Sequence, residues 1–188
     1  MLTDALKEGT REQHRLLEVS NPLPASLPAY IAQLVAFFGF VKPWEERLAA
    51  ALPESDPIRL GRAKSGWLEA DLAYFGYDEA RRSGLPRINE LPSTSSRAAM
   101  LGAAYVLEGA TLGGQIIARH LEATLGLRHG EGYRFFRSYG ERVGSQWQEF
   151  RAELLRASSP SDDPAIIAAA RNTFTLLHGW FVQQNLIQ

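Results

Sequence analysis

The chain contains 188 residues, which is the length of one domain. Hydrophobic residues make up 45% of it and charged residues 22%, a composition typical of a globular protein with an apolar core. The formal net charge of −1 argues against nucleic acid as the main partner, because phosphate binding requires an excess of basic residues or a basic face. The absence of cysteine excludes disulfides, thiolate metal sites, iron–sulfur clusters and cysteine nucleophiles.

Neither the N-terminal segment nor the longest apolar stretch indicates a membrane protein. The N-terminal segment has the pattern of an amphipathic helix and lacks the unbroken apolar run of a signal peptide. The longest apolar stretch, around residues 31–41, is too short to span a bilayer and contains Gln33. We therefore expect one domain over residues 1–188, in the cytoplasm, without a membrane partner.

Apolar residues recur at spacings of three and four along most of the chain, which predicts an all-α, multi-helix bundle. Ser26 and the serine-rich run at 93–96 are expected to cap helices, and Pro43 to kink one. The segment 81–95 is expected to be a long connection. The predicted helices, in chain order, span residues 2–18, 27–51, 57–76, 95–124, 131–157 and 163–186.

The first predicted helix carries a candidate metal ligand, His14. It shares a helical face with Lys7, two turns earlier, and with Glu18, one turn later. A single histidine on such a face packs in the core more often than it binds metal, so the spacing leaves both interpretations open. Lys7 and Arg11 are either an anion-binding edge or an ordinary solvated surface.

Within residues 103–121 of the predicted helix over 95–124 there are three glycines, Gly109, Gly113 and Gly114. Each glycine inside a helix costs about 0.5–1 kcal/mol relative to alanine, so their presence needs a reason. Gly109 and Gly113 are four residues apart and lie on one face. Such a face either admits a flat, bulky group close to the backbone or allows tight packing of another helix, and the spacing alone does not choose.

The last predicted helix places Phe174 and Phe181 seven residues apart, with His178 between them. Core packing is the simplest interpretation, and an aromatic wall for a flat apolar ligand is the alternative. A di-iron bundle is excluded, because no histidine follows a glutamate at a spacing of three. The residues at that position are Arg11, Ile117, Gly126 and Thr175.

Two segments resemble motifs of the heme oxygenase family in its bacterial, biliverdin-producing form. Residues 6–14, LKEGTREQH, are similar to the segment of the proximal helix whose histidine ligates heme iron. Residues 105–114, YVLEGATLGG, resemble the distal helix that bends over the other face of heme. Weaker similarities follow in the same order along the chain, at residues 67–72, 131–136 and 147–154.

The resemblance implies a heme oxygenase-like bundle with heme held between a proximal N-terminal helix and a glycine-kinked distal helix. His14 would ligate the iron, and the backbone of Gly109 and Gly113, with ordered water, would serve catalysis. Arg137 is a further, weaker candidate for the basic edge of the site. The other residues that the resemblance places against the cofactor are Lys7, Arg11, Glu18, Tyr105, Gly114, Phe174 and Phe181.

The implied reaction uses heme as both cofactor and substrate. Dioxygen and external electrons would convert it to biliverdin, with release of CO and ferrous iron. The resemblance implies a ferredoxin or an NAD(P)H-dependent reductase as electron donor, and a phytochrome as a possible acceptor of biliverdin.

One departure supports an alternative function. Ala110 stands where some members carry an aspartate that anchors distal water, and Glu108 is expected to point away from the heme face. A heme carrier or sensor that does not degrade heme is therefore the alternative. A third possibility, a helical interaction module, predicts no affinity for heme.

Overall fold

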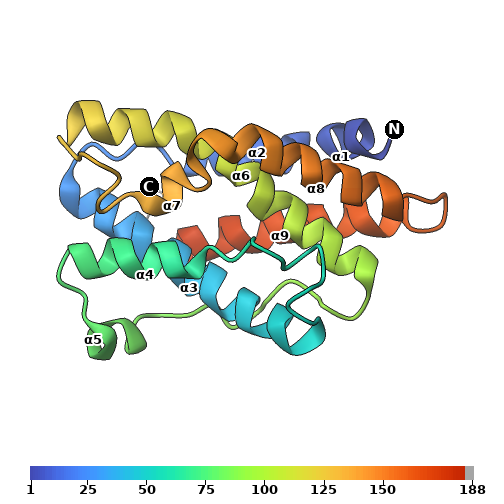
Figure 1. Ribbon diagram of the computed structural model, residues 1–188, viewed down its shortest axis with the longest axis horizontal. Helices are drawn as coiled ribbons and strands as arrows, with labels where there is room; N and C mark the ends of the chain where they lie inside the picture. The colour runs from blue at the N-terminus through green and yellow to red at the C-terminus, as the bar shows by residue number, and fades with distance from the viewer. Residues whose placement is uncertain (185–188) are drawn as a thin grey trace.

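The computed structural model describes residues 1–184 as a stack of α-helices (Figure 1). No β-strand occurs in that part of the chain, so the predicted all-α fold class is confirmed. Within the same residues, no helix has the length and apolarity needed to cross a lipid bilayer. The helices, including one 3₁₀ helix (η1), are α1 (Leu2–Gly9), α2 (Arg11–Ser20), α3 (Leu27–Ala51), α4 (Ser65–Tyr74), α5 (Glu79–Ser83), α6 (Arg97–Thr124), α7 (Arg134–Arg137), η1 (Gly140–Arg142), α8 (Val143–Ala157) and α9 (Asp163–Gln183).

Helices α6 and α9 cross the middle of the molecule, with α1, α2 and α8 on one side and α3, α4 and α5 on the other (Figure 1). The close approach of α6 and α9 depends on Gly102, because a Cβ there would lie 2.4 Å from the carbonyl oxygen of Ile166. On the other side of α9, the Trp180 indole N–H donates a hydrogen bond of 2.7 Å to the carbonyl of Ala36 in α3. These contacts fix α6 and α3 relative to each other across α9.

Two helix starts follow the predicted capping pattern. The side chains of Ser26 and Ser96 accept hydrogen bonds from the backbone N–H groups of Ala29 and Ala99, as expected for N-cap residues. Helix α3 continues through Pro43, which has no N–H to offer the carbonyl of Gly39. That carbonyl instead accepts a bond of 3.0 Å from the N–H of Ile88. The connection over 81–95 is therefore packed against α3, and its start belongs to α5.

The predicted helices 2–18 and 57–76 are wrong in their boundaries. The first is interrupted at Thr10, whose φ of −113° and ψ of 4° separate α1 from α2, and α2 continues to Ser20. The second exists only as α4, because residues 57–64 form turns that include Gly61 at a φ of +67°. Glu45 of α3 then caps the start of α4, accepting bonds from the N–H groups of Lys64 (2.6 Å) and Ser65 (3.1 Å).

The predicted helix over 131–157 is also wrong, since it is broken into α7, η1 and α8. Ser138 and Gly140 have φ values of +45° and +61°, which no α-helix accommodates. The buried carboxylate of Asp71, on α4, holds the start of α7 by accepting from the N–H groups of Arg134 and Phe135. Helix α9 agrees with the predicted 163–186 as far as Gln183, and the last residues of that range, 185–186, lie outside the described residues.

Candidate heme-binding site

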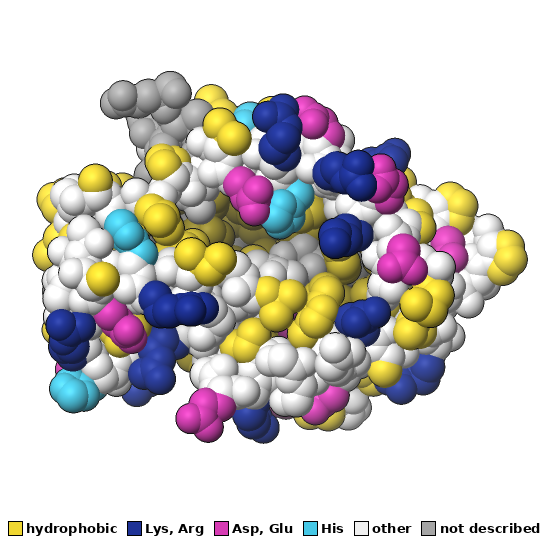
Figure 2. All heavy atoms as spheres, turned by 90° about the horizontal axis from the view of Figure 1, so that it is seen from above, with side chains coloured by type: hydrophobic (Ala, Val, Ile, Leu, Met, Phe, Trp, Pro, Cys, Tyr) yellow, Lys and Arg dark blue, Asp and Glu magenta, His cyan; other side chains and the backbone are white. Residues whose placement is uncertain are grey.

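A cavity of about 370 Å³ opens between α2 and α6, with α7 and α9 beneath it. Its volume lies within the range of about 300–1,000 Å³ that small-molecule sites occupy. The space-filling view shows this face hollowed near its middle, with hydrophobic side chains inside the hollow and basic side chains around one end (Figure 2). The apolar wall comes from five helices and from the turn after α2, and it consists of Leu17, Leu23, Phe37, Val106, Leu107, Ile116, Ile117, Phe135, Phe136, Phe174 and Leu177.

His14 lines the cavity from α2, and its side chain is 56% exposed. Its ring packs edge-on against Phe174, with the ring centroids 5.6 Å apart. Its Nδ1 lies 3.4 Å from Oε1 of Glu18, one helical turn later. A carboxylate beside one ring nitrogen orients an imidazole so that the other nitrogen is available to a metal. The Nε2 atom of His14 is therefore the candidate iron ligand.

Three of the glycines of α6, Gly109, Gly113 and Gly114, lie in two different environments. A Cβ on Gly109 or Gly113 would meet no heavy atom within 4 Å, so nothing in the protein packs against these positions. A Cβ on Gly114 would lie 2.7 Å from the carbonyl oxygen of Phe136. Gly113 and Gly114 line the cavity, whereas Gly109 lies at the next turn of the same face. Tight helix packing thus explains Gly114, and open space for a ligand explains Gly109 and Gly113.

Phe174 and Phe181 occupy different environments. Phe174 lines the cavity beside His14. Phe181 is fully buried and does not line it, and its ring packs edge-on against Phe37 with centroids 4.9 Å apart. Phe37 lines the cavity, so Phe181 supports the wall from behind.

The candidate anion-binding residues gather near the junction of α1 and α2 and do not line the cavity itself. Lys7 and Arg11 are exposed, and Arg11 is bonded to Glu8. Among the described residues Lys7 has no ion-pair partner. The Tyr105 hydroxyl interacts with the side chain of Thr10 at the junction, and burial raises the pKa of this phenol. Arg137 lies elsewhere, in a separate surface depression with Arg134 and Tyr139.

A buried cluster of charged side chains lies on the other side of α6, and its one sign in the sequence is Glu108, a glutamate within an apolar helical stretch. Glu108 is 2% exposed and accepts bonds from Arg62 Nη1 (2.9 Å), from Lys64 Nζ and from Tyr139 Oη (3.1 Å). Burial, together with the neighbouring Glu108 carboxylate, raises the pKa of Tyr139. Glu108 thus points away from the cavity, as predicted, but Lys64 lines the cavity as well.

The residues of the cavity fit heme, a flat apolar ring with two carboxylates at one edge. One imidazole faces an apolar space, and the α6 backbone that lines this space is bare at Gly113, which lacks a Cβ. Basic side chains lie around one end of the hollow (Figure 2). These are the axial ligand, the close face and the cationic edge that heme requires.

Comparisons with known proteins agree with this geometry. The family model of heme oxygenase matches residues 1–183. The heme oxygenase of Neisseria meningitidis, solved with NO and CO bound, has 22% identity and a TM-score of 0.76, covering 100% of this chain and 93% of its own. That of Leptospira interrogans has 21% identity and a TM-score of 0.74, covering 97% and 98%.

The heme oxygenase-1 of the cyanobacterium Synechocystis, solved in complex with heme, has 18% identity and a TM-score of 0.72, covering 98% of this chain and 93% of its own. No curated protein sequence matches the chain significantly. At these identities the solved structures establish the fold, while the family match extends over almost the whole sequence. The chain therefore belongs to the heme oxygenase family.

Proposed function

We propose that the cavity between α2 and α6 binds heme and that the protein cleaves it to biliverdin, with release of CO and ferrous iron. The observation that carries this proposal is that His14 and Gly113 line one apolar cavity from two helices, with no protein atom packed against Gly113 or against Gly109 one turn earlier. Bound heme supplies the iron at which dioxygen is activated and the ring that is opened.

His14 ligates the iron through Nε2. Glu18 accepts from the Nδ1 side of the ring, which fixes the tautomer and the direction of Nε2. The Phe174 ring packs edge-on against the imidazole of His14 and restricts its orientation. A neutral imidazole supplies less electron density to the iron than a thiolate, which disfavours early cleavage of the O–O bond.

The face of α6 that carries Gly109 and Gly113 positions the reacting oxygen. Without a Cβ at either position, the helix backbone lies close to the distal side of heme and restricts the space there. The apolar wall around Phe37, Phe135 and Phe136 excludes bulk water from the ring. Ordered water held by backbone groups supplies hydrogen bonds, because Ala110 offers none.

The propionates of heme extend toward the junction of α1 and α2. Lys7 provides an ammonium group without an ion-pair partner among the described residues, and Arg11 provides a second cation one turn later. The Tyr105 hydroxyl, which meets Thr10 at the junction, donates to the same edge.

The reaction consumes electrons, so the protein requires a donor. The family resemblance favours a ferredoxin or an NAD(P)H-dependent reductase, acting in the cytoplasm of a bacterial cell. The product biliverdin could then serve a phytochrome. The exposed edge of the cavity, near α2, is the place where a donor approaches heme most closely.

Titration of the purified protein with hemin, followed by a reductant under air, tests the proposal. We expect a stoichiometric Soret band that decays into biliverdin absorbance. His14→Ala should lose the axial-ligand spectrum and abolish turnover, while His129→Asn, in a surface turn far from the cavity, should behave as the parent. A Soret band that survives reduction and oxygen would instead identify a heme carrier or sensor, the alternative that Ala110 favours.

A further inference from the structure

A surface depression of about 350 Å³ is lined by α7, by Trp67 of α4 and by the turns on either side of α7. Two arginines, Arg134 and Arg137, stand three residues apart on this short helix, and both are exposed. Neither guanidinium group forms a hydrogen bond or an ion pair with another described residue. None of the described residues that line the depression is acidic. The depression therefore holds two cations without a counter-ion.

The carboxylates closest in the fold and in the sequence do not neutralise these cations. Asp71 is buried on α4 and accepts hydrogen bonds from the backbone N–H groups of Arg134 (2.7 Å) and Phe135 (2.9 Å), not from a guanidinium. Glu131 and Glu141, in the flanking segments, are exposed and do not line the depression. The charge of the two guanidinium groups is thus open to a ligand.

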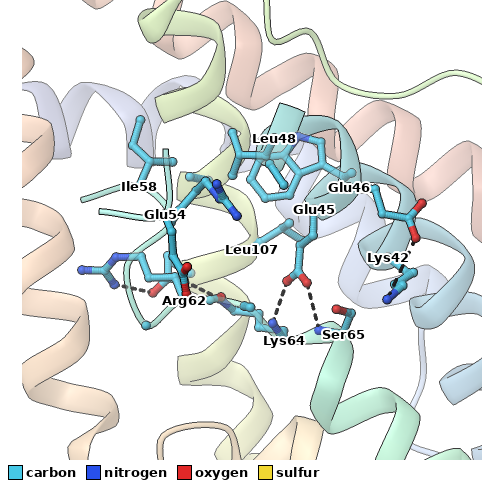
Figure 3. Close-up of a pocket in the computed structure, with 17 residues that line it drawn as sticks. Lys42, Glu45, Glu46, Leu48, Glu54, Ile58, Arg62, Lys64, Ser65 and Leu107 are labelled. Atoms are coloured by element: carbon cyan, nitrogen blue, oxygen red, sulfur yellow. Dashed lines mark hydrogen bonds and ion pairs between the residues drawn. The ribbon is translucent and has the colours of Figure 1, made fainter. Parts of the chain in front are cut away.

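A larger cavity, of about 460 Å³ between α3, α6 and the turns over 54–65, offers a contrast. Figure 3 shows its Glu45 carboxylate held by the backbone of Lys64 and Ser65, and its Lys42 beside Glu46. Most charged groups there already have partners within the protein. The depression beside α7 differs, because its cations have none among the described residues.

Ser138 brings to the depression a hydroxyl that also lacks a partner. Its Oγ is buried and forms no hydrogen bond within the described part of the chain. The backbone of Ser138 has a φ of 45° and a ψ of −116°, and Tyr139 follows at −76° and 2°. These angles are close to those of a type II′ turn, whose first central position favours glycine because a Cβ is strained there. A ligand for the hydroxyl explains why serine occupies this position.

The chemistry of these groups fits a phosphate group. A guanidinium group binds two phosphate oxygens at once, and two guanidinium groups match the charge of about −1.5 to −2 on a phosphate monoester at pH 7. A carboxylate has one negative charge and two oxygens, and would leave one of the cations without a counter-ion. Beside the cations, the rings of Trp67 and Tyr139 pack edge-on with centroids 5.2 Å apart. This aromatic wall offers an apolar surface to the organic part of an ester.

We propose that Arg134, Arg137 and Ser138 form a binding site for inorganic phosphate or a small phosphate monoester. Phe135 and Phe136 of the same helix are buried and line the heme cavity. A phosphate held by the two arginines therefore fixes the helix that forms part of the wall of that cavity. The site goes beyond the heme-cleaving function proposed above and does not depend on it.

Calorimetric titration with inorganic phosphate tests the site, at physiological ionic strength so that charges more than about 8 Å away are screened. We expect saturable binding of one phosphate per chain. Arg137→Gln should weaken it at least about 10-fold, because a charge-assisted hydrogen bond pair is lost. Arg142→Gln is the matched control, since Arg142 is exposed, carries the same charge and does not line the depression.

Two further ligands identify the chemical class. Acetate, a planar monoanion, should bind at least about 10-fold more weakly than phosphate, because it engages only one guanidinium group. Adenosine 5′-monophosphate distinguishes the two sources of the phosphate group. Tighter binding than inorganic phosphate would identify a monoester as the ligand, and equal binding would identify phosphate itself.

Ser138→Gly separates the role of the hydroxyl from that of the turn. Glycine adopts these backbone angles without strain, so the variant should unfold at a higher temperature than the parent when phosphate is absent. It should also bind phosphate at least about threefold more weakly, because one hydrogen bond is lost. A serine that serves only the fold would give the opposite result, a lower unfolding temperature with unchanged binding.

Amide hydrogen exchange locates the ligand on the molecule. Phosphate should slow exchange over residues 132–140 in the parent and in Arg142→Gln, but not in Arg137→Gln. Equal helix content by circular dichroism confirms that the variants keep the fold. The proposal is overturned by any of three results, namely no saturable binding to the parent, parental affinity in Arg137→Gln, or acetate bound as tightly as phosphate.

Discussion

The position of the Glu108 side chain depends on buried cations that its spacing in the sequence does not reveal. It sits among apolar residues on α6 and is neutralised by Arg62 and Lys64, both nearly fully buried. Removing a buried ion that has such partners leaves their charges uncompensated, which typically costs about 3–5 kcal/mol. The stability of the site thus depends on residues from the turns before α4.

We predict that Glu108→Gln lowers the free energy of unfolding by about 3 kcal/mol, because the carboxamide cannot neutralise two buried cations. Glu153→Gln is the matched control, since Glu153 is also buried and bonded to two arginines, but these are 43% and 65% exposed. Glu153→Gln should lower the free energy of unfolding by less than about 1 kcal/mol. Urea unfolding of the two variants measures the difference, and equal losses would contradict the argument.

Residues whose partners are close in the sequence could be predicted from it, and residues whose partners are distant could not. His14 and Glu18 are one turn apart, so their pairing follows from helix geometry. Lys64 falls within the predicted helix over 57–76 without any assigned role, and its contact with Glu108 joins residues 44 positions apart. A glutamate within an apolar helical stretch, as at Glu108, was the one signal in the sequence that a buried cation must exist.

Among the elements, helix α6 contains two glycines that face open space and a neighbouring one that is packed against backbone. Gly109→Ala and Gly113→Ala should each stabilise the protein without heme by up to about 1 kcal/mol, because alanine favours helix and its Cβ meets no atom. The same substitutions should slow heme turnover, since the methyl group occupies the face against the ring. Thermal unfolding and turnover assays, carried out on the same preparations, test both effects.

Gly114→Ala is the contrasting substitution on the same helix. Its Cβ would lie 2.7 Å from a backbone oxygen of Phe136, and such overpacking costs about 1–3 kcal/mol. The unfolding free energy should therefore fall for Gly114→Ala and rise for Gly113→Ala, although the two glycines are neighbours. A stabilised Gly114→Ala would contradict the packing of α7 against α6.

The link between α4 and α7 makes stability depend on pH. Burial raises the pKa of Asp71 from 3.8 to about 6, although the N–H groups of Phe135 and Arg134 and the charge of Arg134 act in the opposite direction. The folded state then binds more protons than the unfolded state between pH 4 and about 6. The contribution of Asp71 to stability therefore decreases as the pH rises through this window.

A shift of about two pKa units corresponds to about 3 kcal/mol. In Asp71→Asn the decrease of the unfolding free energy between about pH 4 and pH 7 should be smaller by about that amount, because no proton is exchanged at this position. Asp56→Asn should change the pH dependence in the opposite direction, because Arg97 and the N–H of Ile58 lower the pKa of Asp56. Denaturant titrations at several pH values provide the test.

Element boundaries were predictable where the capping residue is adjacent and not where it is remote. Ser26 and Ser96 precede their helices by one residue, so the starts of α3 and α6 were predicted closely. The start of α4 depends on Glu45, about 20 positions earlier, and that of α7 on Asp71, more than 60 positions earlier. No local pattern contains this information, and both helices were predicted too long.

At the scale of the whole molecule, the two walls of the heme cavity differ in how firmly they are held. Helix α6 buries twelve residues, among them Leu101, Val106 and Leu121. In α2, no side chain from Arg11 to Val19 is buried. If heme binds as proposed, it completes the packing of α2 against the rest of the bundle.

We predict that hemin slows amide hydrogen exchange over α2 and over residues 109–117 of α6, and leaves α3 nearly unchanged. Segments with few buried apolar contacts open locally at low cost, and a ligand that binds only the closed form suppresses that opening. Exchange measured by mass spectrometry with and without hemin tests this. Slower exchange only around Trp44 and Ile58 would instead place heme on the opposite side of α6 and contradict the proposed site.

We propose above that this protein consumes the heme that it binds. The most direct measurement is a single turnover of the stoichiometric hemin complex with excess reductant under air, in which CO, released iron and tetrapyrrole products are quantified. The account predicts one CO, one ferrous iron and one biliverdin for each heme, and none of these products from His14→Ala. Recovery of intact heme from the parent protein, without CO, would contradict it.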